Sequence, residues 1–128
     1  MRIIIAGSRE FDDYELLKIE VLRLIKEMRD EGYIFKKRDI EIISGTARGA
    51  DKLGERFAKE FKIKCTRMAA DWDKYKKRAG YLRNAQMSAY AKEDKVGILV
   101  AFWNGSRGTK HMIDLANKDG LKVKVIKF

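Results

Sequence analysis

The sequence predicts a three-layer α/β/α fold built around a mostly parallel, five-stranded sheet. Two observations lead to this fold class. Short apolar runs alternate with longer segments of helical periodicity along the whole chain. The segments between successive runs are long enough for helical crossovers, which join parallel strands. No linker, internal repeat or low-complexity segment interrupts the pattern, so we expect residues 1–128 to form a single domain.

Five strands are expected at the apolar runs Arg2–Ala6, Ile40–Ser44, Lys62–Met68, Val96–Phe102 and Leu121–Ile126. Val96–Phe102 is the most apolar run and should lie inside the sheet, because strands buried on both faces are continuously apolar. The lysines of Leu121–Ile126 indicate an edge strand. Cys65, within the third run, is interpreted as an inert core residue.

Four helices are expected between the strands. The first runs from Asp13 to about Glu31, with Asp12 or Asp13 as its N-cap and Gly32 at its end. The others span Ala50–Phe61, Tyr75–Lys92 and Thr109–Asn117. The inward face of Tyr75–Lys92 is predicted to carry Ala79, Leu82, Gln86, Ala89 and Tyr90.

The chain is basic, with 29 Lys and Arg residues against 19 Asp and Glu residues and a net charge of +10. Such an excess attracts anions, whether nucleotides or polynucleotides. The basic residues are scattered over the chain, and they do not alternate with aromatic residues as in a single-strand binding groove. The charge therefore favours a small anionic ligand over a nucleic acid.

A single cysteine excludes an internal disulfide and fits a reducing cytoplasm, where we expect this protein to reside. No apolar stretch reaches the roughly 18 residues of a membrane span, and the N-terminus lacks the features of a secretory signal, so no membrane partner is expected. Because Cys65 and His111 are the only residues of their types, we predict neither a metal nor a cofactor.

Glycine-rich segments follow three of the expected strands, where parallel α/β sheets bind ligands. The first is Gly7-Ser8-Arg9, in which glycine admits a ligand to the backbone, Ser8 offers a hydroxyl group and Arg9 offers a fork of donors suited to phosphate. The alternative is a tight turn beside a surface arginine.

The second segment, Ser44–Asp51, contains Gly45, Thr46, Ala47, Arg48 and Gly49 at the start of an expected helix. Unpaired backbone N–H groups and the helix dipole favour an anion there. The presence of Asp51 partly disfavours an anion at this position, because its own carboxylate could satisfy those donors. It could instead contact ribose hydroxyls or hold Arg48. The segment is not a P-loop, because the Gly-Lys-Ser/Thr ending is absent.

The third segment again joins a strand to a helix, and it contains Asn104, Gly105, Ser106, Gly108 and Thr109. Loops after strands one, two and four converge at one edge of a parallel sheet, so the three segments predict one site.

The helix Tyr75–Lys92 supplies two further candidates, Arg83 and Asn84, which share a flank with Gly80 and Met87. Arg78 is interpreted as a surface residue. Trp72 and Tyr75 could stack on a base or act as lids on the core.

Four motifs, GSR, GTARGAD, ADWDKYKKRAGYLRNAQM and NGSRGTKHMID, occur in this order. Together they resemble the YspA-like branch of the SLOG superfamily over nearly the whole chain. SLOG domains are Rossmann-like, and the superfamily includes the Lonely Guy phosphoribohydrolases, the DNA-processing protein DprA and sensors of nucleotide or NAD-derived signals in defence systems. The resemblance implies a nucleotide or ADP-ribose-like ligand across the loops around Gly7, Gly45 and Gly105.

The match to Lonely Guy enzymes is partial. Arg83 precedes Met87 by four residues, as the catalytic arginine of that family precedes a methionine, so Arg83 would be catalytic if this chain were an enzyme. Aligning Gly108-Thr109 with the second motif of that family puts Met112 where its glutamate belongs, and Asp114 is a poor substitute. Without that carboxylate, hydrolysis of an N-glycosidic bond lacks its expected acid–base partner.

Three functions follow from these residues. The leading one is binding of a small phosphate-bearing nucleotide or of an ADP-ribose or NAD-derived ligand, for sensing or for sequestration, as a phage-encoded protein directed against a nucleotide-signalled defence would do. In this function Arg9, Arg48 and Arg83 neutralise charge, and Asp51 or Asn84 contacts ribose. The alternatives are a phosphoribohydrolase of nucleoside monophosphates and DprA-like single-stranded DNA binding. A homo-oligomer is left open.

Overall fold

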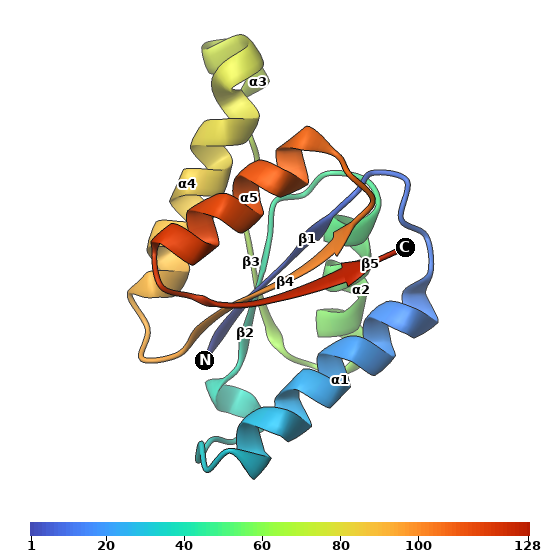
Figure 1. The fold of residues 1–128 in the computed structure, drawn as a ribbon, viewed down its shortest axis with the longest axis vertical. Helices are drawn as coiled ribbons and strands as arrows, with labels where there is room; N and C mark the ends of the chain where they lie inside the picture. The colour runs from blue at the N-terminus through green and yellow to red at the C-terminus, as the bar shows by residue number, and fades with distance from the viewer.

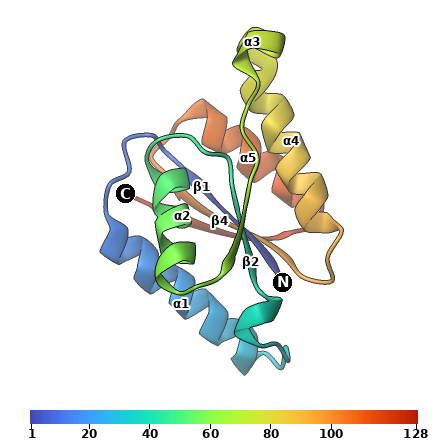
Figure 2. The same ribbon diagram turned by 180° about the vertical axis from the view of Figure 1, so that it is seen from behind.

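The computed structural model describes residues 1–128 and consists of one parallel sheet between two layers of helices (Figures 1 and 2). The sheet has the order β3-β2-β1-β4-β5, and every neighbouring pair is parallel. Its strands are β1 (Arg2–Gly7), β2 (Glu41–Ser44), β3 (Lys64–Arg67), β4 (Gly97–Trp103) and β5 (Lys122–Lys127). The predicted three-layer, Rossmann-like α/β fold is confirmed, as are the inner position of β4 and the edge position of β5.

The helices are α1 (Tyr14–Asp30), α2 (Ala50–Glu60), α3 (Trp72–Tyr75), α4 (Ala79–Lys92) and α5 (Arg107–Lys118), with short 3-10 turns at Lys37–Asp39 and Lys76–Arg78. Helices α1 and α2 cover one face of the sheet, and α4 and α5 cover the other (Figures 1 and 2). Helix α3 and the first turn of α4 project beyond the sheet as an arm (Figure 1). None of the helices combines the length and the apolarity that crossing a bilayer requires.

The alternation of side chains along β1 supplies both cores. Ile3 and Ile5 are fully buried against α1 and α2, whereas Ile4 and Ala6 pack against α4 and α5. This arrangement explains why the strand is apolar at every position rather than at alternate ones. Cys65, expected in the core, is only half-buried, because β3 is an edge strand.

The predicted inward face of α4 is wrong at Leu82, Gln86 and Ala89, which are exposed. It is correct at Ala79, which is buried, and Tyr90 is half-buried against the core. The other buried residues of the helix are Asn84, Met87, Ser88 and Ala91. Apolar and polar residues are spread nearly evenly around this helix, so its hydrophobic pattern does not single out a face. The buried polar residues Asn84 and Ser88 are tolerated because both are hydrogen-bonded.

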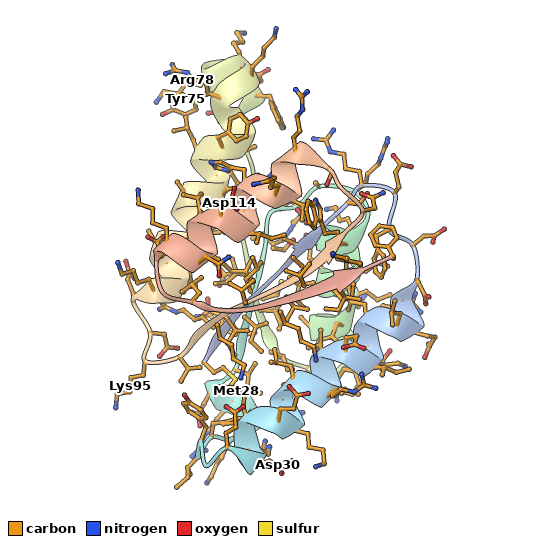
Figure 3. All side chains as sticks on the ribbon, viewed as in Figure 1. Met28, Asp30, Tyr75, Arg78, Lys95 and Asp114 are labelled. Carbon is orange, nitrogen blue, oxygen red and sulfur yellow. The ribbon has the colours of Figure 1, made fainter.

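The expected helix from Tyr75 is also broken into three pieces. Helix α3 begins earlier, at Trp72, where the Asp71 carboxylate accepts a hydrogen bond from Lys74 N at 3.1 Å. The chain then turns at Lys76, whose φ of 53° is unusual for a residue with a side chain. The resulting arm carries Tyr75 and Arg78 at its outer end, away from the sheet (Figure 3). Arg78 is exposed, as predicted.

The chain order places a topological switch between β1 and β4. After β1 the strands are added in one direction, to β2 and β3, and after α4 they are added in the other, to β4 and β5. The loops that leave β1 and β4 therefore diverge to opposite faces of the sheet, and a crevice opens between them.

Gly54 tests how closely α2 approaches the sheet. A Cβ atom at this position would lie 2.9 Å from two side-chain carbons of Ile5. We expect Gly54→Ala to lower the free energy of unfolding by about 1–3 kcal/mol through overpacking. In an open helix the same change would raise stability by about 1 kcal/mol. Urea unfolding measures the difference, and a stabilised variant would show that α2 lies further from β1.

Candidate functional site

A cleft of about 480 Å³ opens at the carboxyl edge of β1 and β4, between these loops and α4. It brings together residues from all three glycine-rich segments and from α4. The predicted site residues that line it are Gly7, Ser8, Arg9, Ala47, Asp51, Arg83, Asn84, Asn104, Ser106, Gly108 and Thr109. A neighbouring cavity of about 360 Å³ is lined by Gly45, Thr46 and Arg48 and shares Arg9, Ala47, Trp72 and Arg83 with the cleft.

Two predicted residues, Gly49 and Gly105, line neither cavity. Lining residues that the sequence did not single out include Ala6, Glu10, Lys77 and Tyr81. Glu10 directly follows the Gly7-Ser8-Arg9 segment, so its position was a usable signal. Tyr81 was missed because the face of α4 was assigned wrongly.

The loop after β1 packs tightly against β4 and against the start of α2. A Cβ atom on Gly7 would lie 2.4 Å from the carbonyl oxygen of Phe102, and one on Gly49 would lie 2.3 Å from that of Ser8. Ala50 N also donates to the Ser8 carbonyl oxygen, at 3.3 Å. Both glycines are therefore required where the first loop packs against β4 and the start of α2.

The loop after β2 is organised by Asp51 and Ser44. The Asp51 carboxylate accepts a hydrogen bond from Ala47 N at 3.1 Å, and the Ser44 hydroxyl accepts one from Thr46 N at 3.0 Å. Asp51 thus satisfies a loop donor, one of the alternatives that the sequence left open. It does not hold Arg48, which is exposed and forms an ion pair with Glu10 at 3.2 Å.

Asp51 is the buried carboxyl group of the cleft, with 5% of its surface exposed. Burial raises its pKa from 3.8 to about 6, although the hydrogen bond from Ala47 and the charge of Arg83 act in the opposite direction. Arg83 and Asp51 both lie close to Gly45, where a Cβ atom would be 2.8 Å from the nearest side-chain atom of each. A side chain at Gly45 would push this arginine and this carboxylate apart.

Arg83 and Asn84 connect the second loop to the third. The Arg83 guanidinium donates to the Gly45 carbonyl oxygen and, through Nε, to Asn84 Oδ1 at 3.2 Å. The Asn84 amide group donates to the Gly108 carbonyl oxygen at 3.2 Å and contacts His111 Nδ1 at 3.1 Å. Burial lowers the pKa of His111 and so favours the neutral ring, whose Nδ1 accepts this bond in the tautomer that carries its proton on Nε2.

The start of α5 is left without a side-chain cap. The Ser106 hydroxyl donates to the Thr109 hydroxyl at 3.0 Å instead of accepting from the helix. The backbone N–H groups of Arg107, Gly108 and Thr109 have no acceptor in the protein. Nothing lies within 4 Å of the position that a Gly108 Cβ atom would occupy. By contrast, α1 is capped by Asp13, which accepts from Leu16 N at 3.0 Å.

The cleft contains no metal-binding arrangement of side chains, since no three His, Cys, Asp or Glu residues are grouped to hold an ion. Its apolar floor includes Met87 and Met112, both 1% exposed. Met112 occupies the α5 position at which the Lonely Guy resemblance would place a glutamate. The cleft therefore provides anion donors, a buried carboxyl group and an apolar floor.

The fold and this cleft define a class: a Rossmann-like α/β domain with a ligand cleft at its topological switch. A family model described as "YspA, cpYpsA-related SLOG family" matches residues 1–75, and the chain belongs to this family. It is also similar to the "Gene 61 protein" of Mycobacterium phage D29, with 30% identity over 128 residues that cover 95% of this chain and 93% of that protein. No solved structure matches the chain.

Asp51 gives a pH-dependent prediction. Because its folded-state pKa of about 6 exceeds the ordinary value of 3.8, protonation favours the folded state. This stabilisation is fully present below pH 3.8 and is lost as the pH rises through 6. We therefore compare the change in the free energy of unfolding that Asp51→Asn causes at pH 8 and at pH 4. We expect this change to be more stabilising at pH 8, by about 1–3 kcal/mol.

Urea unfolding of both proteins at the two pH values measures this effect. Asp114→Asn, at an exposed carboxylate on α5, is the control and should change by less than about 0.5 kcal/mol between them. If Asp51→Asn instead raised the free energy of unfolding more at pH 4 than at pH 8, the burial of an ionisable Asp51 would be contradicted.

Proposed function

We propose that this protein binds a small phosphate-bearing ligand of the nucleotide type in the cleft, as a sensor of that ligand or as a protein that sequesters it. The single observation that carries this proposal is the uncapped start of α5, whose residues Gly108 and Thr109 line the same cleft as Arg9 and Arg83. Membership of the SLOG family supports a nucleotide-related ligand. The similar phage protein supports a role connected with phages or with defence against them.

The electrostatics of the cleft favour a phosphate group. Free N–H groups at a helix start attract anions because the helix dipole is positive there. Arg9 is exposed at the rim and lines both cavities, whereas Arg83 lies deeper, where burial lowers its pKa. An anion placed between them gains hydrogen bonds from planar guanidinium donors.

The size and continuity of the two cavities suggest the extent of the ligand. Because Arg9 and Arg83 line both, a ligand bridged by phosphate groups could extend from the cleft into the neighbouring cavity. A nucleotide would use the cleft, and an ADP-ribose or NAD-derived ligand would use both. The polar groups of Asp51 and Asn104 remain available to ribose hydroxyls.

Arg9 provides the first test of this proposal. We expect Arg9→Ala to weaken binding of AMP, GMP, CMP, UMP or ADP-ribose about tenfold, because a hydrogen bond to a charged group is lost. The control is Arg38→Ala, at an exposed arginine before β2, at the other end of the sheet, and it should leave affinity within about twofold. Isothermal titration calorimetry measures both.

Two results would contradict the proposal. One is the absence of binding by all five compounds at millimolar concentration. The other is binding of a single-stranded oligonucleotide that none of the mononucleotides displaces, which would favour the DprA-like alternative.

One observation favours hydrolysis as a second candidate function. Asp51 lines the cleft with a pKa of about 6, which suits a group that transfers protons near neutral pH. In such a reaction water adds to C1′ of the ribose, the bond from C1′ to the base nitrogen breaks, and Asp51 exchanges the proton between the water and the base. Asp51 would then supply the carboxyl group that Met112 cannot.

Chromatography after incubation with nucleoside monophosphates tests this second function. If it is correct, free base and ribose 5-phosphate accumulate, and Asp51→Asn reduces their rate at least about 100-fold, the usual contribution of general acid–base catalysis. Because asparagine keeps a side-chain oxygen for ribose hydroxyls, binding by Asp51→Asn should persist, which separates a loss of chemistry from a loss of the site. Intact nucleotide after prolonged incubation would leave binding as the whole function.

A further inference from the structure

Trp72, at the start of α3, exposes apolar surface inside the site. The residue is 48% exposed, and it lines both the cleft and the neighbouring cavity. It belongs to neither of the two buried cores of the molecule. A core lid, the alternative that the sequence left open, would be covered by the elements that it closes.

The ring is nevertheless held in place. The turn that carries it is capped by Asp71, and Tyr75 N donates to the Asp71 carbonyl oxygen at 3.0 Å. The ring edge lies over the first turn of α4, where a Cβ atom on Gly80 would be 3.3 Å from Trp72 Cη2. An exposed aromatic ring that is fixed before binding offers contact area at a small entropic cost.

Gly80 also relates the ring to the charged part of the site. The position of its absent Cβ atom lies 3.9 Å from Arg83 Nη2, so the indole ring and the guanidinium group are both neighbours of one backbone position. A ligand whose phosphate reaches Arg83 therefore has the indole ring within the span of the same molecule.

The other aromatic residues near the site differ from Trp72 in their contacts or in their position. The Tyr81 ring meets the His111 ring edge to face, with centroids 4.5 Å apart. Trp103 donates through Nε1 to the Ser106 carbonyl oxygen at 2.9 Å and so supports the third loop. Tyr75 lines neither cavity. Trp72 is the aromatic residue that lines both the cleft and the neighbouring cavity.

We propose that Trp72 is a stacking platform for a planar nitrogen heterocycle at the end of the ligand opposite its phosphate group. This inference rests on the proposed function, because it assigns the second half of the same ligand. Aromatic side chains stack on every nucleobase, and the contact is tolerant of base identity. The platform therefore requires a base on the ligand without selecting one.

The test compares ligands that have a base with one that lacks it. Dissociation constants of AMP, GMP, CMP and UMP, and of ribose 5-phosphate, are measured by calorimetry for wild type, Trp72→Leu and Trp72→Phe. In wild type we expect at least one of the nucleotides to bind more tightly than ribose 5-phosphate. Trp72→Leu should weaken that binding about tenfold, which corresponds to about 1.4 kcal/mol, and should leave ribose 5-phosphate unchanged. Trp72→Phe should retain part of the difference in affinity between that nucleotide and ribose 5-phosphate.

The matched control is Tyr33→Leu, because Tyr33 is a similarly exposed aromatic residue, 45% exposed, between α1 and β2. It should change no dissociation constant. Base stacking also quenches indole fluorescence, so a nucleotide should quench wild type and ribose 5-phosphate should not, and the quenching should disappear in Trp72→Leu.

Each contrary result has a distinct meaning. If ribose 5-phosphate binds as tightly as all four nucleotides, the stacking platform is wrong and the phosphate site stands. If Trp72→Leu weakens ribose 5-phosphate and nucleotides equally, Trp72 shapes the cleft and does not stack. If wild type binds none of the five compounds, the proposed function fails, and the platform fails with it.

Discussion

The hydrogen bonds of Arg83 and Asn84 hold the site together. These adjacent side chains on α4 bond to the carbonyl oxygens of Gly45 and Gly108, which belong to loops that follow different strands. The sheet alone brings the loops to the same edge, but it does not fix the distance between them. Because the bonds run to backbone atoms, they constrain the path of both loops whatever side chains those loops carry. The position of the start of α5 beside the cleft depends on this constraint.

The site also retains groups that oppose stability. A buried carboxyl group with a raised pKa, an uncapped helix start and a half-exposed indole ring each cost free energy in the unliganded protein. Elsewhere the same chain caps α1 with Asp13 and buries Phe11, Phe57 and Phe102 in a packed core. Unfavourable groups gathered in one cleft are typical of a binding site.

The sequence predicted most of the fold because each strand carries its own signal. The apolar β1 and β4 and the lysine-rich β5 could be placed in the sheet from composition alone. The face of α4 could not, since its buried side includes Asn84 and Ser88, whose hydrogen-bond partners lie far away in the chain. For the same reason the sequence offered Asn84 as a ribose contact, whereas its amide hydrogens are used within the protein. The glycines did mark positions where another group comes close to the backbone. At Gly49, however, that group is the Ser8 carbonyl oxygen and not a ligand.

The central claim is that a phosphate group of the ligand is bound at the start of α5. Two-dimensional NMR of ¹⁵N-labelled protein during titration with a nucleotide that binds tests this claim most directly. The account predicts that the amide signals of Gly108 and Thr109 shift most strongly, in the direction of new hydrogen bonds, and that inorganic phosphate shifts the same two signals. Unchanged signals at these residues, together with shifts elsewhere in the protein, would contradict it.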